Sequence, residues 1–287
     1  MSNPVIADKL RHKEFFVAPG VQDMIAALIV DKLGFDVVYA SGFWLTASCL
    51  GLPDAGLATY SQMLERMTAL TRTSRAAVIG DADTGYGGLL NVRHTVRGYE
   101  TAGVTAIQIE DQEFPKKCGH TPGTRTIPTE DMVRKIEVAK EAVVDKGNTL
   151  IIARTDARAS EGLDGCLRRA EAYARAGADI LFPEALRDEE EMRAVCAASE
   201  VPVMANMANG GKTPILPAAT LAEIGFAFAI FPSLASLTAA KAVETALLRL
   251  KRDGRGDADE TSIFDFAEFC RLVGLEEVWE FERKWST

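Results

Sequence analysis

The sequence lacks the features that would assign it to several large protein classes. No apolar run approaches the roughly 20 residues that cross a bilayer, and residues 1–13 are polar without a signal-peptide core. The formal net charge is −9, which is opposite to the basic face of a nucleic-acid-binding protein. We therefore expect a cytoplasmic protein that binds neither membranes nor nucleic acids.

Cysteine and histidine are scarce as well. The five cysteines are scattered along the 287 residues without metal-type spacing, and there are three histidines. This usage indicates free thiols in a reducing compartment. Cys49, Cys166, Cys196 and Cys270 fall in helical patterns, where a lone cysteine is usually a small buried apolar group.

The chain does contain a repeated sequence pattern in which a helix is expected to end, a glycine follows and a short apolar run begins. It occurs at Gly34, Gly103, Gly177 and Gly225. Glycine suits this place because the residue after a helix often needs a positive φ. Further apolar runs at 76–79, 150–153 and 201–204 bring the expected number of strands to about eight.

These apolar runs are nearly continuous rather than alternating, which indicates parallel strands that are buried on both faces. Eight βα units in this length favour a closed (β/α)8 barrel of the TIM type over an open doubly wound sheet. We predict a single domain, 1–287, with a barrel core at about 15–252 and a C-terminal helical tail at 261–284. The tail carries large aromatic residues, which suit packing on a partner subunit.

Polar residues directly follow the apolar runs, where the strands are expected to end. They are Ser41, Asp81, Asp83, Glu110, Arg154, Asp156, Glu184 and Asn206. Barrel enzymes place their active sites at the C-terminal ends of their strands. The sequence therefore predicts an active site that these residues line.

Three of these residues, Asp81, Asp83 and Glu110, are acids that would meet at one rim. Like charges this close disfavour one another unless a cation joins them. An all-oxygen ligand set suits Mg²⁺ or Mn²⁺. The alternative is that an acid caps a following helix, as Asp83 could do before Thr84 and Gly85.

Arg154 ends an apolar run, and a guanidinium there suits bidentate binding of a carboxylate. Its alternative is an internal salt bridge to Asp156 or Glu184. Cys118 lies between two lysines and the pair Gly119-His120. Nearby cations favour a thiolate, so we expect Cys118 to exchange a proton readily, with His120 as the alternative acid–base group.

Residues 116–120, Lys-Lys-Cys-Gly-His, resemble the signature loop of the isocitrate lyase and phosphoenolpyruvate mutase superfamily. The resemblance extends over nearly the whole chain, through the segments at 41–42, 52–54, 81–87, 109–111, 153–157, 182–185 and 205–207. It implies a barrel whose last helix is exchanged between subunits, usually in a homotetramer that is a dimer of dimers. It also implies Mg²⁺ near Asp81, Asp83 and Glu110, with Asp54 in the outer shell.

The resemblance further implies where the substrate binds. Backbone N–H groups of Ser41, Gly42 and Phe43 would hold its oxyacid end, and the loop that carries Cys118 would close over it. The other residues implied to contact it are Gly119, His120, Arg154, Glu184, Asn206 and Thr213.

The cysteine loop is similar to that of the carbon–carbon bond lyases, whereas phosphonate mutases of the superfamily lack it. Residues 206–214 resemble the 2,3-dimethylmalate lyase and petal-death-protein branch, and the extra arginines of methylisocitrate lyases are missing. The implied reaction is Mg²⁺-dependent cleavage of a 2-hydroxydicarboxylate, or of a related tricarboxylate, into an α-keto acid and a carboxylic acid. Cys118 would be the general acid and Tyr39 a candidate base, with a metal-bound water as the alternative base. The alternatives are an oxaloacetate hydrolase, a phosphonate mutase and a barrel that binds a dicarboxylate without turnover.

Overall fold

The computed structural model describes residues 3–121, 123–254, 256 and 263–286. Within them, eight strands alternate with helices along the chain. The strands are β1 (Phe16–Val21), β2 (Val37–Ala40), β3 (Ala77–Asp81), β4 (Ala106–Glu110), β5 (Leu150–Thr155), β6 (Ile180–Pro183), β7 (Met204–Asn206) and β8 (Phe228–Phe231).

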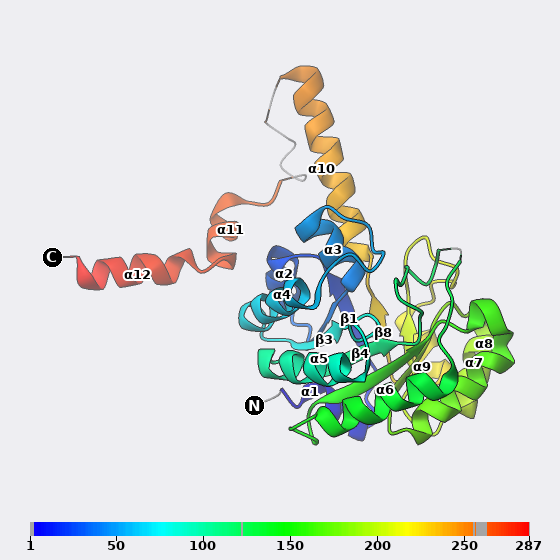
Figure 1. Cartoon of the computed structure of the whole chain (residues 1–287). Coiled ribbons are helices and arrows are strands. Elements are labelled where there is room, and N and C mark those ends of the chain that lie inside the picture. Colours follow the sequence, from blue (N-terminus) through cyan, green and yellow to red (C-terminus); the bar gives the residue numbers. More distant parts are fainter. Residues whose placement is uncertain (1–2, 122, 255, 257–262, 287) are drawn as a thin grey trace.

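All the strand pairs are parallel, in the order β6-β5-β4-β3-β2-β1-β8-β7. The two outer strands meet at a parallel bridge between Leu181 and Val203, which closes the ring. The predicted (β/α)8 barrel of the TIM type is therefore confirmed (Figure 1).

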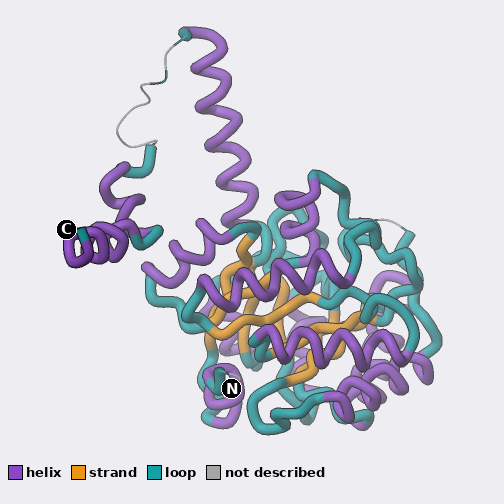
Figure 2. Tube along the Cα trace, turned by 60° about the vertical axis from the view of Figure 1, so that its left-hand side comes forward, coloured by secondary structure: helices purple, strands orange, loops and turns teal. Residues whose placement is uncertain are grey.

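Helices cover the outside of the barrel. They are α2 (Met24–Lys32), α4 (Tyr60–Thr73), α5 (Leu89–Ala102), α6 (Thr129–Ala142), α7 (Arg158–Arg175), α8 (Glu189–Ala198) and α9 (Ala218–Ile224), with α3 (Gly42–Leu50) at the rim. Helix α10 (Leu234–Asp253) begins after β8 and projects away from the barrel for most of its length (Figures 1 and 2). Gly103 and Gly225 end α5 and α9 at φ 99° and 113°. The repeated glycine thus has the C-cap role that the sequence predicts.

The barrel interior is filled by apolar side chains from the strands. Phe16 and Phe228 stack there with ring centroids 4.6 Å apart, and Phe182 is fully buried. The N-terminal helix α1 (Val5–Arg11) inserts Ile6 into the same cluster. Because β-branched and aromatic side chains pack this interior, the polar site is confined to the other, C-terminal end of the strands.

Two expectations are wrong in detail. The run at 201–204 is not a strand over its whole length, because β7 begins only at Met204. Pro202 lacks the N–H that a central strand must donate. Cys49 is exposed, whereas Cys166 and Cys270 are buried as expected and Cys196 is partly buried.

The C-terminal helices stand apart from the barrel (Figures 1 and 2). Helix α11 (Phe266–Leu272) lies against α2, where Lys32 pairs with Glu268 and lies over the Phe264 ring. Helix α12 (Leu275–Trp285) has no buried residue. The start of the predicted tail, 261–262, lies outside the described residues. None of the helices in the described ranges is both long and apolar enough to span a membrane.

Candidate active site

A cavity of about 190 Å³ opens at the C-terminal ends of the strands. Most of the predicted site residues line it, namely Tyr39, Ser41, Phe43, Asp54, Asp81, Cys118, Gly119, His120, Arg154, Glu184 and Asn206. Five predicted residues do not: Gly42, Asp83, Glu110, Asp156 and Thr213. Thr213 instead lines a small neighbouring pocket behind Glu184 and Asn206.

Asp81 organises the floor of the cavity. Its Oδ2 accepts a hydrogen bond from the backbone N–H of Gly42 at 3.1 Å. Its Oδ1 accepts from the backbone N–H of Asp83 at 3.0 Å and from the Gln108 amide at 3.2 Å. The Gly42 N–H, which was expected to bind substrate, is therefore occupied by Asp81.

Lys116 joins two of the other acids. Its Nζ lies 2.5 Å from Asp54 Oδ1 and 2.6 Å from Asp83 Oδ1, and its side chain is almost fully buried. Burial raises the pKa of Asp83 to about 6, although Lys116 opposes the shift. Burial alone would lower the pKa of Lys116, but Asp83, Glu110 and Asp54 outweigh it and raise that pKa. The helix-cap alternative for Asp83 is wrong, because the N-cap of α5 is Gly88.

The acids have the chemistry of a magnesium site. Glu110 Oε1 is buried without a hydrogen-bond partner among the described residues, whereas Asp83 Oδ1 is paired with Lys116. Burial raises the pKa of Glu110 well above its ordinary value. As the described side chains stand, no three acidic, histidine or cysteine groups converge closely enough to hold an ion by themselves. Unsatisfied carboxylate oxygens without soft ligands fit a hard divalent ion that completes its shell with water.

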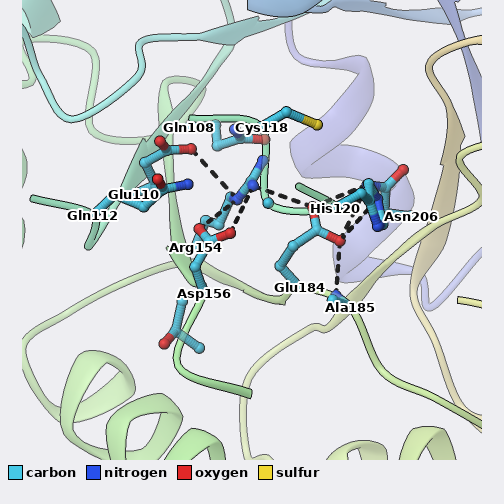
Figure 3. A network of polar contacts seen from close by, with 12 residues as sticks. Gln108, Glu110, Gln112, Cys118, His120, Arg154, Asp156, Glu184, Ala185 and Asn206 are labelled. Carbon is cyan, nitrogen blue, oxygen red and sulfur yellow. Dashed lines mark hydrogen bonds and ion pairs between the residues drawn. The ribbon is translucent and has the colours of Figure 1, made fainter. Parts of the chain in front are cut away.

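Arg154 is held at the centre of the site by three carboxylates (Figure 3). Its Nε and Nη2 each donate to Asp156 at 2.9 Å. The guanidinium also lies 3.4 Å from Glu110 and 3.3 Å from Glu184. The internal salt bridge is thus present, yet the Nη1 group makes no hydrogen bond to a described residue and can donate to a bound carboxylate.

The thiol of Cys118 differs from the prediction. Burial raises its pKa above the ordinary 9.0, and the backbone N–H of His120 and the charge of Arg154 offset this only in part. The expected thiolate is wrong because the charge of Lys116 is directed at Asp54 and Asp83 instead. A thiol that stays protonated at neutral pH is suited to donate a proton.

Asn206 and His120 cover the side of the cavity next to Glu184 (Figure 3). The Asn206 amide donates to both Glu184 oxygens, at 3.3 and 3.0 Å. Its Oδ1 is buried and has no partner, so it can accept a hydrogen bond from a ligand hydroxyl. His120 Nε2 lies 3.4 Å from Glu184 Oε1.

Tyr39 does not have the surroundings of a base. Its hydroxyl donates to Gln108 Oε1 at 3.0 Å. Burial, together with the charge of Asp81, raises its pKa well above 10.0. Both observations favour a neutral Tyr39 that orders Gln108.

Sequence reasoning missed several residues of the site. Lys116 was noted only as a neighbour of Cys118, and Gln108, Trp44 and Lys212 were assigned no role in the site. Gln108 was the one with a usable signal, because it is a polar residue inside the buried run of β4.

The comparisons with known proteins agree with this geometry. Residues 7–251 match the family model described as phosphoenolpyruvate phosphomutase. The chain belongs to this family. It is 42% identical to 2,3-dimethylmalate lyase of Eubacterium barkeri over 97% of this chain and 96% of that protein. It is 41% identical to 2-methylisocitrate lyase of Aeropyrum pernix over 95% and 87% of the two chains.

Solved structures with a similar fold belong to the same group of enzymes. A 2,3-dimethylmalate lyase structure has a TM-score of 0.91 at 34% identity and covers 98% of this chain and 94% of its own. An oxaloacetate acetylhydrolase bound to 3,3-difluorooxalacetate has a TM-score of 0.91 at 30% identity, with 99% and 98% coverage. A phosphonopyruvate hydrolase complex with oxalate and Mg²⁺ has a TM-score of 0.89 at 28% identity, with full coverage of both chains. The family member described here is a carbon–carbon lyase of the isocitrate lyase and phosphoenolpyruvate mutase superfamily, as the sequence predicts.

Proposed function

We propose that this lyase cleaves a 2-hydroxydicarboxylate of the 2,3-dimethylmalate type between C2 and C3. The products are an α-keto acid and a carboxylic acid. One observation carries the proposal: a protonated thiol, Cys118, and a guanidinium, Arg154, face the same cavity beside a set of buried acids. This arrangement binds a carboxylate and supplies a proton to an atom next to it.

Binding would use donors that the fold leaves free. The Nη1 group of Arg154 donates to one substrate carboxylate, and Asn206 Oδ1 accepts from the hydroxyl. Ser41 and Phe43 lie at the start of α3, where backbone N–H groups and the helix dipole favour an anion. The second carboxylate is oriented there.

Cleavage of the C2–C3 bond requires loss of the hydroxyl proton and gain of a proton at C3. A carboxylate oxygen on the acidic side of the cavity, from Asp54 or Asp81, accepts the hydroxyl proton, and the O–H electron pair forms the new C=O bond. The C2–O bond becomes a carbonyl as the C2–C3 electron pair moves to C3, which becomes the enediolate of the departing acid. Cys118 then gives its proton to C3 as general acid. Closure of the cysteine loop excludes water, so that the donors act in a site of low dielectric.

Mg²⁺ or Mn²⁺ held by Asp81, Asp83 and Glu110, with Asp54 through water, would neutralise the negative charge of the bound substrate. The protein's own contribution is to hold Asp81, Asp83 and Glu110 buried and to leave Glu110 Oε1 without a hydrogen-bond partner. Exposure of the site to solvent would remove that advantage, because water would satisfy the oxygens instead.

The charge of the site favours two carboxylates over three. Among the described residues that line the cavity, Arg154 is the one arginine. A third buried carboxylate without a cationic partner would cost several kcal/mol. We therefore propose that methylisocitrate is a poorer substrate than 2,3-dimethylmalate.

A panel of malate analogues tests the function directly. Purified protein with Mg²⁺ is assayed for release of keto acid from malate, 2,3-dimethylmalate and methylisocitrate, and for release of oxalate from oxaloacetate. We expect the highest kcat/KM for 2,3-dimethylmalate. Equal or faster cleavage of methylisocitrate would show that the assignment to the 2,3-dimethylmalate lyase branch is wrong. Release of oxalate from oxaloacetate, with no cleavage of the other three compounds, would favour a hydrolase.

We also propose that the chain acts as a homotetramer in the cytoplasm, with barrel and tail as one unit and the tail packed on a partner. Helix α12 exposes Trp279, Phe281 and Trp285, and α10 exposes Val243 and Leu247. Such contiguous apolar faces usually mark interfaces. Deletion of residues 275–287 should reduce the oligomer measured by analytical ultracentrifugation. An unchanged number of chains per oligomer would contradict this assembly.

A further inference from the structure

Two loops contact each other over the cavity. The first is the cysteine loop, defined here as residues 113–121 after β4. The second follows β7 and is called here the latch loop, residues 207–213. The backbone N–H of Lys212 donates to His120 Nδ1 at 3.2 Å, and the Lys212 Nζ donates to the Gly119 carbonyl at 3.3 Å.

Gly211 makes the contact close. A Cβ at this position would lie 2.9 Å from both Cε1 and Nδ1 of the His120 ring and 3.0 Å from the Ala208 carbonyl. Unlike Gly210, which has a φ of 78°, Gly211 does not have a positive φ. Glycine is therefore required here by the approach of the imidazole, rather than by backbone strain.

The same contact fixes the tautomer of His120. Because Nδ1 accepts from Lys212, the ring proton of the neutral imidazole is on Nε2, which lies 3.4 Å from Glu184 Oε1 and 3.4 Å from Asn206 Nδ2. Both nitrogens are thus engaged by the protein. His120 is suited to hold the loop in place and not to exchange protons with a substrate.

The rest of the cysteine loop is anchored elsewhere. The Gln112 side chain bonds the Lys117 N–H at 3.0 Å and the Lys117 carbonyl at 2.8 Å. The latch loop is itself fixed by the Asn209 N–H, which donates to Ser233 at 2.8 Å. The contact at His120 therefore joins the tip of one anchored loop to another.

We propose that Gly211 and Lys212 are positioning residues that latch the cysteine loop shut through His120, and so hold Cys118 over the substrate. The inference rests on the proposed role of this loop as the cover of a lyase site. It adds a pair of residues outside the reacting groups on which closure depends. The contacts predict that loosening the latch opens residues 113–121 while metal binding at Asp81 is preserved.

Hydrogen–deuterium exchange tests the latch without any substrate. Gly211→Ala forces the imidazole aside, and Lys212→Met removes only the Nζ bond to Gly119. Gly147→Ala is the matched control, because Gly147 lies in the loop before β5, has no positive φ and meets only one atom, at 3.9 Å. One hydrogen bond changes an opening equilibrium by about two- to tenfold.

We expect amide exchange of residues 113–121 to rise about tenfold in Gly211→Ala, by less in Lys212→Met and not at all in Gly147→Ala. Exchange that rises only within 207–213, or in neither loop, overturns the latch. If Gly211→Ala does not fold, Lys212→Met decides the question. The Lys212 side chain is exposed, so this variant should fold. Unchanged amide exchange of residues 113–121 in Lys212→Met would also count against the latch.

Kinetics separate the latch from the proposed function. With a substrate from the malate panel, Gly211→Ala should lower the single-turnover rate about tenfold and leave Mn²⁺ affinity unchanged. If amide exchange of the cysteine loop rises in Gly211→Ala but the protein cleaves none of the panel, the latch is supported and the proposed substrate is contradicted. If the protein cleaves a panel substrate but exchange of the cysteine loop is unchanged in Gly211→Ala, the lyase function is supported and the latch is contradicted.

Discussion

The Cys118→Ser variant gives the sharpest test of the proposed chemistry. The substitution changes one atom, and the backbone of the loop does not depend on it. The Cys118 carbonyl accepts from both the N–H and the hydroxyl of Thr121, at 2.9 and 2.6 Å. The variant should therefore keep the shape of the loop and its affinity for substrate and metal.

The expected loss is in the rate. Burial holds the pKa of Cys118 above 9.0, so the thiol is protonated at neutral pH and is still far more acidic than a serine hydroxyl. General acid catalysis contributes about 10²–10⁴-fold, which corresponds to about 3–5 kcal/mol. We expect single-turnover cleavage to fall by that factor.

Single-turnover kinetics and calorimetric binding of substrate should be measured on the same preparation. Cys49→Ser is the control, because Cys49 is an exposed thiol on α3. The wild-type rate should fall only as the pH rises through the thiol pKa above 9.0, and the variant should lack this fall. A Cys118→Ser rate within about tenfold of wild type, about 1.4 kcal/mol, would remove the thiol from the chemistry.

The remaining predictions concern the metal and the stability of the barrel. Chelation should abolish turnover, Mg²⁺ or Mn²⁺ should restore it, and Asp83→Ala should lower metal affinity and rate together; full activity of metal-free protein would refute the acid cluster as a metal site. Arg158 bonds Glu191 and lowers the pKa of that carboxyl below 4.5. This stabilisation is present above pH 4.5 and is lost as the pH falls through the lower folded-state pKa. Glu191→Gln should therefore cost about 1 kcal/mol in urea unfolding at pH 7, and this cost should shrink as the pH is lowered below 4.5; a cost that does not change with pH would contradict the pairing.

The sequence was sufficient for the barrel and for most of the rim. Parallel strands bring their C-terminal ends to one side, so Asp81, Glu110, Arg154, Glu184 and Asn206 had to approach one another once the strand pattern was assigned. Glycine after a helix marked the helix ends for a local conformational reason. Both inferences use only neighbours along the chain.

The parts that failed depend on where side chains point in space. The charge of Lys116 was assigned to Cys118 because the two are neighbours in sequence, but its ammonium reaches Asp54, from a loop 62 positions earlier. Burial then decided the sign of the Cys118 pKa shift. Tyr39 was a candidate base by resemblance, and the hydrogen bond that its hydroxyl donates to Gln108 could be identified only from the folded chain.

The charges at the rim support the proposed divalent cation and the proposed dicarboxylate substrate. The buried carboxyl groups there are Asp54, Asp81, Asp83, Glu110, Asp156 and Glu184, and their buried cations are Lys116 and Arg154. A dicarboxylate adds two negative charges to this excess, and desolvating such charges without partners costs several kcal/mol each. Binding is favourable only if further positive charge enters with the substrate, which a divalent ion supplies. A third carboxylate would need yet another cation, and Lys117, exposed at the edge of the cavity, is too well hydrated to compensate for it fully.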